Sequence, residues 1–241
     1  MSSAPASATP AAAHAAPASR WGGRYGRYVL ACCCLACFLG GQGAYLFLSA
    51  PGRASLLGFA STSVANLTRD PLGCLAASVF VTGGNLGSTL TWLPLMAVAL
   101  CGAARAAGPW RALGVAAAGH VIGTVVSEGL VAWRISTGAL PGSDRFLTDV
   151  GPSYVVVSSL VLAIVCLPWS RRDRAAWTWR ILAVLAMLLL IFPGHIYSGL
   201  FSLDVAAVGH MTATAVAAIT VLGLRRRPQP ATVPPTAIPI R

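Results

Sequence analysis

The chain has 241 residues, of which 56% are hydrophobic and only 10% charged, and its mean hydropathy is +0.72. A water-soluble domain of this size does not have so apolar a composition, so the sequence indicates a polytopic membrane protein. All 17 basic residues are arginine and the formal net charge is +11. In so apolar a chain, many arginines indicate loops held on the cytoplasmic side rather than a surface that binds nucleic acid. We therefore expect no nucleic-acid partner.

Six apolar windows are long enough to cross about 30 Å of hydrocarbon at about 1.5 Å per residue. They cover residues 27–49, 87–106, 111–137, 150–168, 178–200 and 203–224. A further apolar window, residues 72–84, has only 13 residues and follows the first span. A stretch of this length is typical of an interfacial or re-entrant element. The predicted fold class is therefore all-α, a membrane bundle of six transmembrane helices with an interfacial loop after the first.

Both ends of the chain differ from this bundle in composition. Residues 1–26 are rich in alanine, serine and proline, and residues 225–241 are rich in arginine and proline. Neither segment has enough apolar surface to offset the entropy lost on ordering, so we expect two disordered tails flanking a membrane domain at 27–224.

The arginines predict the orientation of the bundle. With six spans and the N-terminus inside, 13 of the 17 arginines fall on the cytoplasmic side. The outer side keeps Arg53, Arg69, Arg134 and Arg145. Every loop then obeys the positive-inside rule, which predicts a multi-pass protein of the cell membrane with both termini cytoplasmic. Membrane lipids are expected partners, and arginines beside the membrane could contact anionic headgroups.

All seven cysteines fall in apolar windows. Their odd number argues against a disulfide framework, and we expect them to be small buried hydrophobic residues. Cys34 and Cys37 have redox spacing, but no charged residue of the first span could activate a thiolate there.

Polar residues inside the predicted spans are costly in a bilayer and are therefore candidates for function. They are His120 and Glu128 in the third span, Ser153 in the fourth, His195 in the fifth, and Asp204 and His210 in the sixth. Ser153 and His210 are expected about 5 Å and 10 Å below the outer ends of their spans, which places both in the outer half of the membrane.

Ser153 follows Gly151 and Pro152 at the start of its span. The N-terminus of a helix has unsatisfied N–H groups and the positive end of the helix dipole, so it can stabilise an oxyanion. Gly151 would permit a tight turn, and proline is suited to the first helical turn. His210, at matching depth on another span, is the base that a nucleophilic serine needs. The pair is a candidate Ser/His dyad.

The sequence GPSY at 151–154, the sequence DVAAVGHMTA at 204–213 and the short apolar window at 72–84 resemble the rhomboid intramembrane serine proteases, especially divergent rhomboid-like proteins of high-GC bacteria. By that resemblance Ser153 is the nucleophile, Gly151 is the motif glycine that supports the oxyanion site, and His210 is the base. The resemblance extends over about residues 27–224, and it implies a serine endopeptidase that cleaves transmembrane segments near the outer membrane surface. It implies no metal and no cofactor.

The chain departs from the family pattern at three places. Tyr154 stands where the family usually has glycine, and we expect this bulkier group to crowd the packing of the fourth and sixth spans. Leu90 and Pro94 align with the histidine and asparagine that bind the oxyanion from the second span. The third departure, Glu128, has no counterpart in the family pattern. Losing two oxyanion donors, each worth about 10²- to 10³-fold in rate, would leave a very slow enzyme.

Other interpretations of these residues remain open. Ser153 could serve only as a helix cap, and His210 could form an interhelical polar pair with Asp204. His120 and Glu128 lie about 80° apart around a helix, so they could form a hydrogen-bond network, relay a proton or bind a metal.

At the level of the whole protein, the alternative to a protease is a catalytically inactive rhomboid-like protein that binds transmembrane helices of its partners. A transporter or a haem protein using the histidines at 120, 195 and 210 is a further possibility, although the sequence has no internal repeat of the transporter type.

Overall fold

The computed structural model describes residues 26–168 and 172–225, and within these ranges the regular elements are helices without strands. The all-α fold class is confirmed. The main helices are α1 (Val29–Phe47), α5 (Leu86–Ala107), α6 (Pro109–Ser136), α7 (Ser153–Cys166), α8 (Arg174–Ile191) and α9 (Val205–Arg225). Shorter elements are α2 (Ala50–Ala60), α3 (Val64–Arg69), α4 (Pro71–Ser78) and the 3₁₀ turns η2 (Gly26–Tyr28), η3 (Gly142–Phe146) and η4 (Leu200–Ser202). The predicted tails, 1–26 and 225–241, lie almost wholly outside the described residues.

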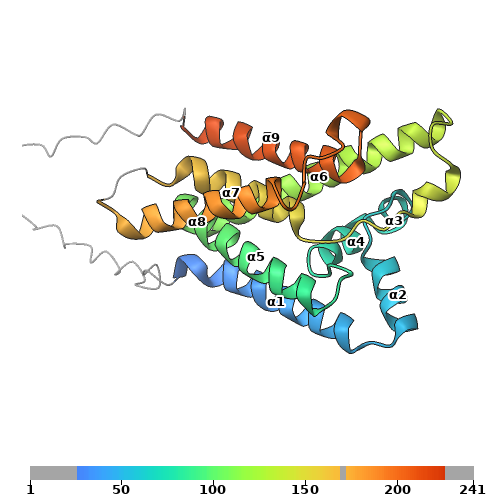
Figure 1. The fold of residues 1–241 in the computed structure, drawn as a ribbon, viewed down its shortest axis with the longest axis horizontal. Helices are drawn as coiled ribbons and strands as arrows, with labels where there is room; N and C mark the ends of the chain where they lie inside the picture. Colours follow the sequence, from blue (N-terminus) through green and yellow to red (C-terminus); the bar gives the residue numbers. More distant parts are fainter. Residues whose placement is uncertain (1–25, 169–171, 226–241) are drawn as a thin grey trace, which may run out of the picture.

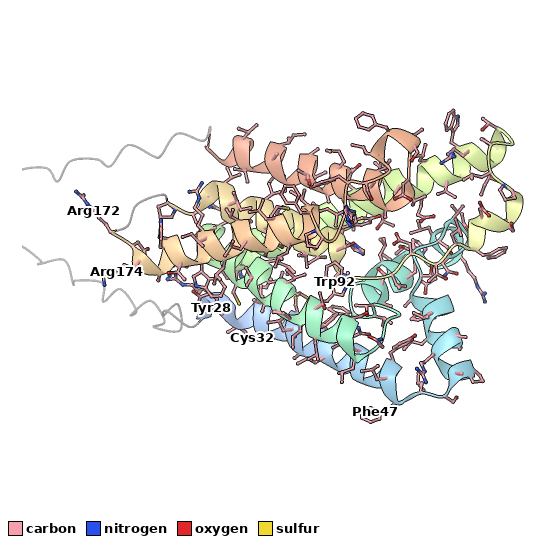
Figure 2. The ribbon with its side chains drawn as sticks, viewed as in Figure 1. Tyr28, Cys32, Phe47, Trp92, Arg172 and Arg174 are labelled. Atoms are coloured by element: carbon pink, nitrogen blue, oxygen red, sulfur yellow. The ribbon has the colours of Figure 1, made fainter. Side chains whose placement is uncertain are left out.

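The long helices run roughly along one direction, with α1 and α9 on opposite sides of the bundle (Figure 1). The start of α1 and the end of α9 lie at the same end. Arg172, Arg174 and Tyr28 lie at that end as well, whereas Phe47 lies toward the opposite end (Figure 2). This arrangement agrees with the predicted grouping of the arginines, and it makes the orientation with both termini on one side geometrically consistent.

Helix α7 is the centre of the bundle, where it packs against α5, α6, α8 and α9. Its residues from Tyr154 to Leu160 are all buried, whereas the other main helices each leave several side chains exposed. Close approach depends on small residues: a Cβ on Gly119 of α6 would lie 2.6 Å from the Ser158 side chain of α7. Packing of this kind is characteristic of helices that associate in lipid.

Five helices of the described residues are long and apolar enough to cross a membrane, namely Gly26–Phe47, Leu86–Ala107, Pro109–Ser136, Arg174–Ile191 and Val205–Gly223. The fourth predicted span, 150–168, is instead the 14-residue helix α7, which covers about 21 Å at about 1.5 Å per residue. The prediction of span length was wrong here because apolar residues continue beyond the helix, into the extended backbone at Leu167. The six-span count stays a prediction, because α7, the fourth predicted span, is shorter than the other five helices.

The fifth predicted span, 178–200, also differs from the structure, because α8 begins at Arg174 and ends at Ile191. Asp173 caps its start by accepting a hydrogen bond from the Ala176 N–H at 3.0 Å. Pro193 has no N–H to continue the helical hydrogen bonds, and His195 has a φ of +49°. The chain therefore leaves the helix well before residue 200 and crosses to α9 as turns.

The region between α1 and α5 contains three short helices, of which α4 occupies the first part of the predicted 72–84 element. Each begins at a side-chain cap, Ser49, Ser63 and Asp70 respectively, which accepts a hydrogen bond from a backbone N–H of the first turn. They form a layer at the end of the bundle away from the chain termini (Figure 1).

Candidate functional site

The backbone before Ser153 is held by two neighbouring segments. The Thr62 N–H donates to the Asp149 carbonyl at 2.9 Å, and the Gly151 N–H donates to the Ser78 carbonyl at 2.8 Å. The first contact fixes the chain to the α2–α3 connection and the second fixes it to the end of α4. The place of Ser153 therefore depends on residues that precede it by more than 70 positions.

The side chains of Thr62 and Asp149 form a further hydrogen bond between the same two residues. The Thr62 hydroxyl donates to Asp149 Oδ2 at 3.2 Å. Burial raises the pKa of Asp149 above its ordinary value, and the hydrogen bond from Thr62 opposes that shift without cancelling it. The fold therefore favours the protonated form of this acid more than the unfolded chain does.

Helix α7 starts at Ser153 without a side-chain cap. Gly151 has a φ of +130°, which a residue with a side chain rarely adopts, and Pro152, with a φ of −79°, occupies the cap position. Since proline has no side-chain acceptor, the residue that precedes α7 cannot accept a side-chain hydrogen bond from the first N–H groups of the helix. Together with the helix dipole, they can stabilise negative charge beside the half-buried Ser153 side chain.

The buried side chain of His210 lies on α9 with its two ring nitrogens in different environments. Nδ1 lies 2.9 Å from the Ile196 carbonyl oxygen, which can only accept, so Nδ1 carries the proton and donates it. Nε2 then carries the lone pair, and it is a buried atom with no hydrogen-bond partner among the described residues. This tautomer presents a free base.

Tyr154 lies between two histidines. Its ring centroid is 5.1 Å from that of His210, edge to face, and 6.2 Å from that of His120. The expectation that this tyrosine crowds α7 and α9 is wrong, because Gly209 makes room for it: a Cβ there would lie 2.1 Å from the Tyr154 hydroxyl oxygen. Gly123 of α6 provides space on the other side, with its Cβ position 3.4 Å from the ring.

The structure brings the two residues of the predicted dyad into one region without a direct bond. Ser153 is adjacent in sequence to the tyrosine whose ring contacts His210. Within residues 26–168 and 172–225, no hydrogen bond joins the side chains of Ser153 and His210. Catalytic hydrogen bonds are often long in a protein without substrate and form in the substrate complex. The roles of both residues remain predictions.

His120 and Glu128 lie on α6 and face the short helices rather than each other. His120 Nε2 donates to the Leu75 carbonyl at 3.0 Å and lies 3.2 Å from the Ser78 hydroxyl. Glu128 is 3% exposed and lines a cavity of about 290 Å³ with Leu67 and other residues of α3 and α4. No hydrogen bond connects His120 with Glu128 in the part of the chain that the structure describes. Both residues instead connect α6 to the layer of short helices.

The two remaining polar candidates lie at the ends of helices. Asp204 is exposed and caps α9, where its Oδ2 accepts from the Ala207 N–H at 3.1 Å. The Asp204 carboxylate therefore serves as a helix cap. Among the described residues it makes no hydrogen bond to His210. His195 is exposed in the turns between α8 and α9.

An apolar groove of about 690 Å³ lies between α5 and α8. Its lining includes Trp92 and Leu95 from α5, Leu185 and Leu189 from α8, and Ile196. Ile196 is also the residue whose carbonyl holds His210. The groove and His210 thus share Ile196 as a neighbour.

Sequence reasoning missed one buried polar cluster. Gln42 of α1 is 1% exposed; its amide donates to the Thr82 hydroxyl, and its carbonyl oxygen accepts from the Thr82 N–H at 3.3 Å. It also lies 3.4 Å from the Thr89 hydroxyl of α5. A lone glutamine within an apolar span was the available signal, since such a residue requires partners. The cluster fixes the connection between α4 and α5.

Apolar helices of membrane-spanning length surround a buried helix that starts at a serine, and the ring of His210 contacts Tyr154 in the first turn of that helix. Since His210 Nε2 has no hydrogen-bond partner among the described residues, these features define a multi-pass membrane protein with a candidate nucleophile and base. A family model described as "Rhomboid-like protein" matches residues 32–229. The chain belongs to the rhomboid-like family. No curated protein and no solved structure matches it.

Proposed function

We propose that the protein is an intramembrane serine protease in which Ser153 is the nucleophile and His210 the base. The observation that carries the proposal is the state of His210. Its Nδ1–H is held by the Ile196 carbonyl, its ring contacts Tyr154 in the first turn of α7, and its buried Nε2 has no partner among the described residues. A buried basic nitrogen without a partner is costly, and proton transfer from a serine would use it. Membership of the rhomboid-like family is consistent with a protease or an inactive relative.

In the proposed reaction, Ser153 Oγ attacks a peptide carbonyl while His210 Nε2 accepts the hydroxyl proton. Negative charge then develops on the carbonyl oxygen, and the N–H groups at the start of α7 stabilise it. The histidine gives its proton to the leaving amine, and water attacks the acyl-enzyme in a second half-reaction with the same base. The Ile196 carbonyl accepts from Nδ1–H throughout, so it keeps the ring oriented and stabilises the imidazolium that forms.

The substrate is a transmembrane segment that enters from the bilayer. The apolar groove between α5 and α8 supports this part of the proposal, because its lining suits an apolar helix and includes Ile196, whose carbonyl holds His210. Ordering a transmembrane helix there would expel lipid from the approach to His210. Cleavage would take place on the side opposite the chain termini, which we infer to be the outer side of the membrane, with both termini in the cytoplasm.

The alternative function is binding of partner transmembrane helices without cleavage. It is favoured by Leu90, which aligns with one of the family's oxyanion donors yet is 62% exposed and has no hydrogen to donate. In the proposed enzyme the N–H groups of α7 must stabilise the oxyanion without that help. A slow protease and an inactive relative would share every feature of the bundle, so reactivity of Ser153 is what separates them.

Labelling of the purified protein with a fluorophosphonate probe tests serine reactivity without knowledge of a substrate. Wild type should be labelled, and Ser153→Ala should abolish labelling. His210→Asn should slow it about 10²- to 10⁴-fold, because the amide can donate to the Ile196 carbonyl but provides no basic nitrogen.

Exposed residues between α8 and α9 provide matched controls, Ser198→Ala and His195→Asn. Asparagine tolerates the positive φ of position 195, so this control tests loss of a histidine and not backbone strain. Both controls should be labelled like wild type. A folded wild-type protein that is not labelled would refute the protease and leave helix binding as the function.

A further inference from the structure

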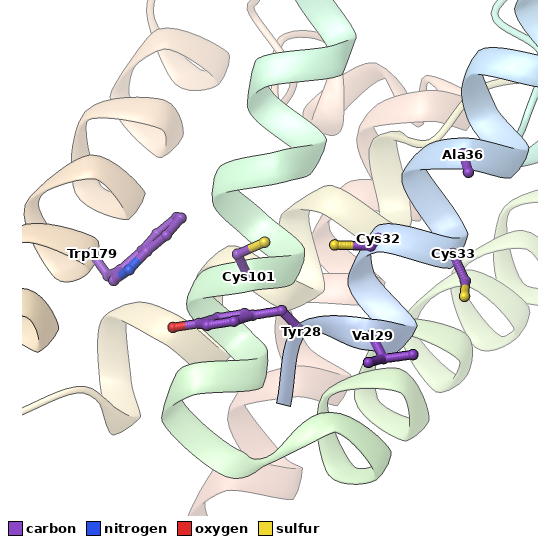
Figure 3. Close-up of a pocket in the computed structure, with 7 residues that line it drawn as sticks. All are labelled: Tyr28, Val29, Cys32, Cys33, Ala36, Cys101 and Trp179. Atoms are coloured by element: carbon purple, nitrogen blue, oxygen red, sulfur yellow. The ribbon is translucent and has the colours of Figure 1, made fainter. Parts of the chain in front are cut away.

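A second apolar groove, of about 680 Å³, lies between α1, α5 and α8 in the half of the bundle where α1 begins (Figure 3). We call it the proximal groove. Its lining includes Tyr28, Cys32, Cys33, Ala36, Cys101 and Trp179. It is separate from the groove that approaches His210, which uses the first half of α5 and the second half of α8.

The wall of the proximal groove on α1 faces outward from the protein. Cys32, Cys33 and Ala36 are all exposed. The expectation that the cysteines of this span are buried was wrong for Cys32, Cys33 and Cys37, which are exposed, and Cys34 is only partly buried. From Tyr28 to Ala36 the wall follows eight residues, about 12 Å at about 1.5 Å per residue. The volume lies within the range of about 300–1,000 Å³ that is usual for small-molecule sites. The occupant must be apolar and reach the groove from the bilayer.

The end of the proximal groove where α1 begins, which we call its mouth, has a more polar lining than the end at Ala36. The ring of Tyr28 extends from η2 below Cys101 toward α8, where Trp179 lies, and its hydroxyl group points to that side (Figure 3). Tyrosine and tryptophan combine an apolar ring with a polar group, and they gather where hydrocarbon meets headgroups. The polarity of the lining therefore decreases from the start of α1 toward Ala36, as it does along a phospholipid from headgroup to acyl chain.

Several arginines lie at the same end of the molecule as the mouth. Arg27 immediately precedes Tyr28, and Arg105 lies one turn beyond Cys101 on the same face of α5. Arg172 and Arg174 lie at the start of α8, at the same end of the molecule as Tyr28 (Figure 2). The acid at this end within the described residues is Asp173, whose carboxylate oxygens both lie 2.8 Å from Arg105 Nη2. The surroundings of the mouth keep a net positive charge.

We propose that the proximal groove binds one acyl chain of an anionic phospholipid, whose phosphate lies near Arg27 at the end of the bundle that also carries the arginines of α8. Charge complementarity favours this occupant over a second copy of the chain, since a symmetric dimer through this groove would bring two arginine clusters together. The bound lipid would contact α1, α5 and α8 together, on the side of the membrane where α1 begins. This inference does not depend on whether Ser153 is reactive.

Native mass spectrometry of the delipidated full-length protein in detergent tests the proposal. The protein is incubated with equal amounts of dioleoylphosphatidylglycerol and dioleoylphosphatidylcholine, which have the same acyl chains. We expect wild type to retain one phosphatidylglycerol in preference to phosphatidylcholine. Each arginine near an anionic lipid contributes about 1 kcal/mol, so Arg27→Gln should reduce the preference about fivefold. Arg145→Gln, at the opposite end of the bundle, should not change it.

The acyl chain is tested by filling the groove. Ala36→Trp should reduce retention of both lipids at least tenfold, whereas Cys37→Trp, at an exposed position of α1 outside the groove lining, should leave it unchanged. Cys33→Phe is a second filling variant for use if Ala36→Trp does not fold. Equal retention of the two lipids by wild type, full retention by the filled variants, or a lipid-free dimer would each overturn the proposal.

Discussion

Replacing Gly209 with alanine tests the packing that places Tyr154 against His210. A Cβ on Gly209 would lie 2.1 Å from the Tyr154 hydroxyl oxygen and 2.2 Å from the ring carbon that carries it. Tyr154 is 3% exposed, so its ring cannot move aside without disturbing its neighbours. Overpacking of this kind destabilises by about 1–3 kcal/mol, and the better helix propensity of alanine returns about 1 kcal/mol. We expect a net loss of up to about 2 kcal/mol.

Thermal unfolding in detergent, followed by tryptophan fluorescence, measures this loss. For a chain of this size each kcal/mol lowers the midpoint by about 2–4 °C. Gly223→Ala is the matched control on the same helix, because a Cβ there has no atom within 4 Å, and its midpoint should be unchanged or higher. In a Tyr154→Ala background, Gly209→Ala should no longer destabilise. An equal effect of Gly209→Ala in both backgrounds would show that the ring does not lie over residue 209.

Three further predictions follow from the structure. Gly151→Ala should destabilise by about 1–3 kcal/mol in thermal unfolding, because its φ of +130° is strained for any residue with a side chain. Gly41→Ala should lower the unfolding midpoint, since its Cβ would lie 2.5 Å from the Phe80 carbonyl oxygen, whereas Gly40→Ala, with open space, should not. Because the pKa of Asp149 is raised, the folded state binds the proton of this carboxyl more tightly than the unfolded state does. The contribution of Asp149 to stability therefore falls as the pH rises from about 3.9 through the folded pKa. Asp149→Asn should therefore gain stability relative to wild type as the pH rises above about 4. Parallel stability profiles of the two proteins would contradict the burial of this carboxyl.

The sequence predicted the helices best where apolar composition and end signals coincide. Residues 87–106 and 203–224 correspond closely to α5 and α9. Asn85 and Asp204, which directly precede these helices, cap them by accepting hydrogen bonds from backbone N–H groups. The prediction was wrong where apolar residues continue past the end of a helix. Beyond Ile191 the sequence stays apolar, but Pro193 and the positive φ of His195 end α8. Hydropathy alone does not separate a helix from an apolar turn.

The candidate site could be predicted in its residue types but not in its contacts. Ser153 and His210 were identified from their positions in the spans, whereas the contact of His210 with Ile196 joins residues 14 apart across irregular turns. The place of Tyr154 was not predictable from its size, because the space it occupies belongs to glycines on two other helices. Interhelical contacts of this kind depend on the rotation of each helix, which the periodicity of so uniformly apolar a sequence does not specify.

The most direct test of the proposed dyad is an experimental structure of the protein after reaction with a fluorophosphonate. The proposal predicts phosphorus bonded to Ser153 Oγ and a phosphonyl oxygen near the N–H groups at the start of α7. It also predicts His210 Nε2 within about 3.2 Å of the serine or phosphonyl oxygen, with Nδ1 still donating to the Ile196 carbonyl. Phosphorus on another residue, or His210 Nε2 turned away from an adduct on Ser153, would contradict the assignment of nucleophile and base.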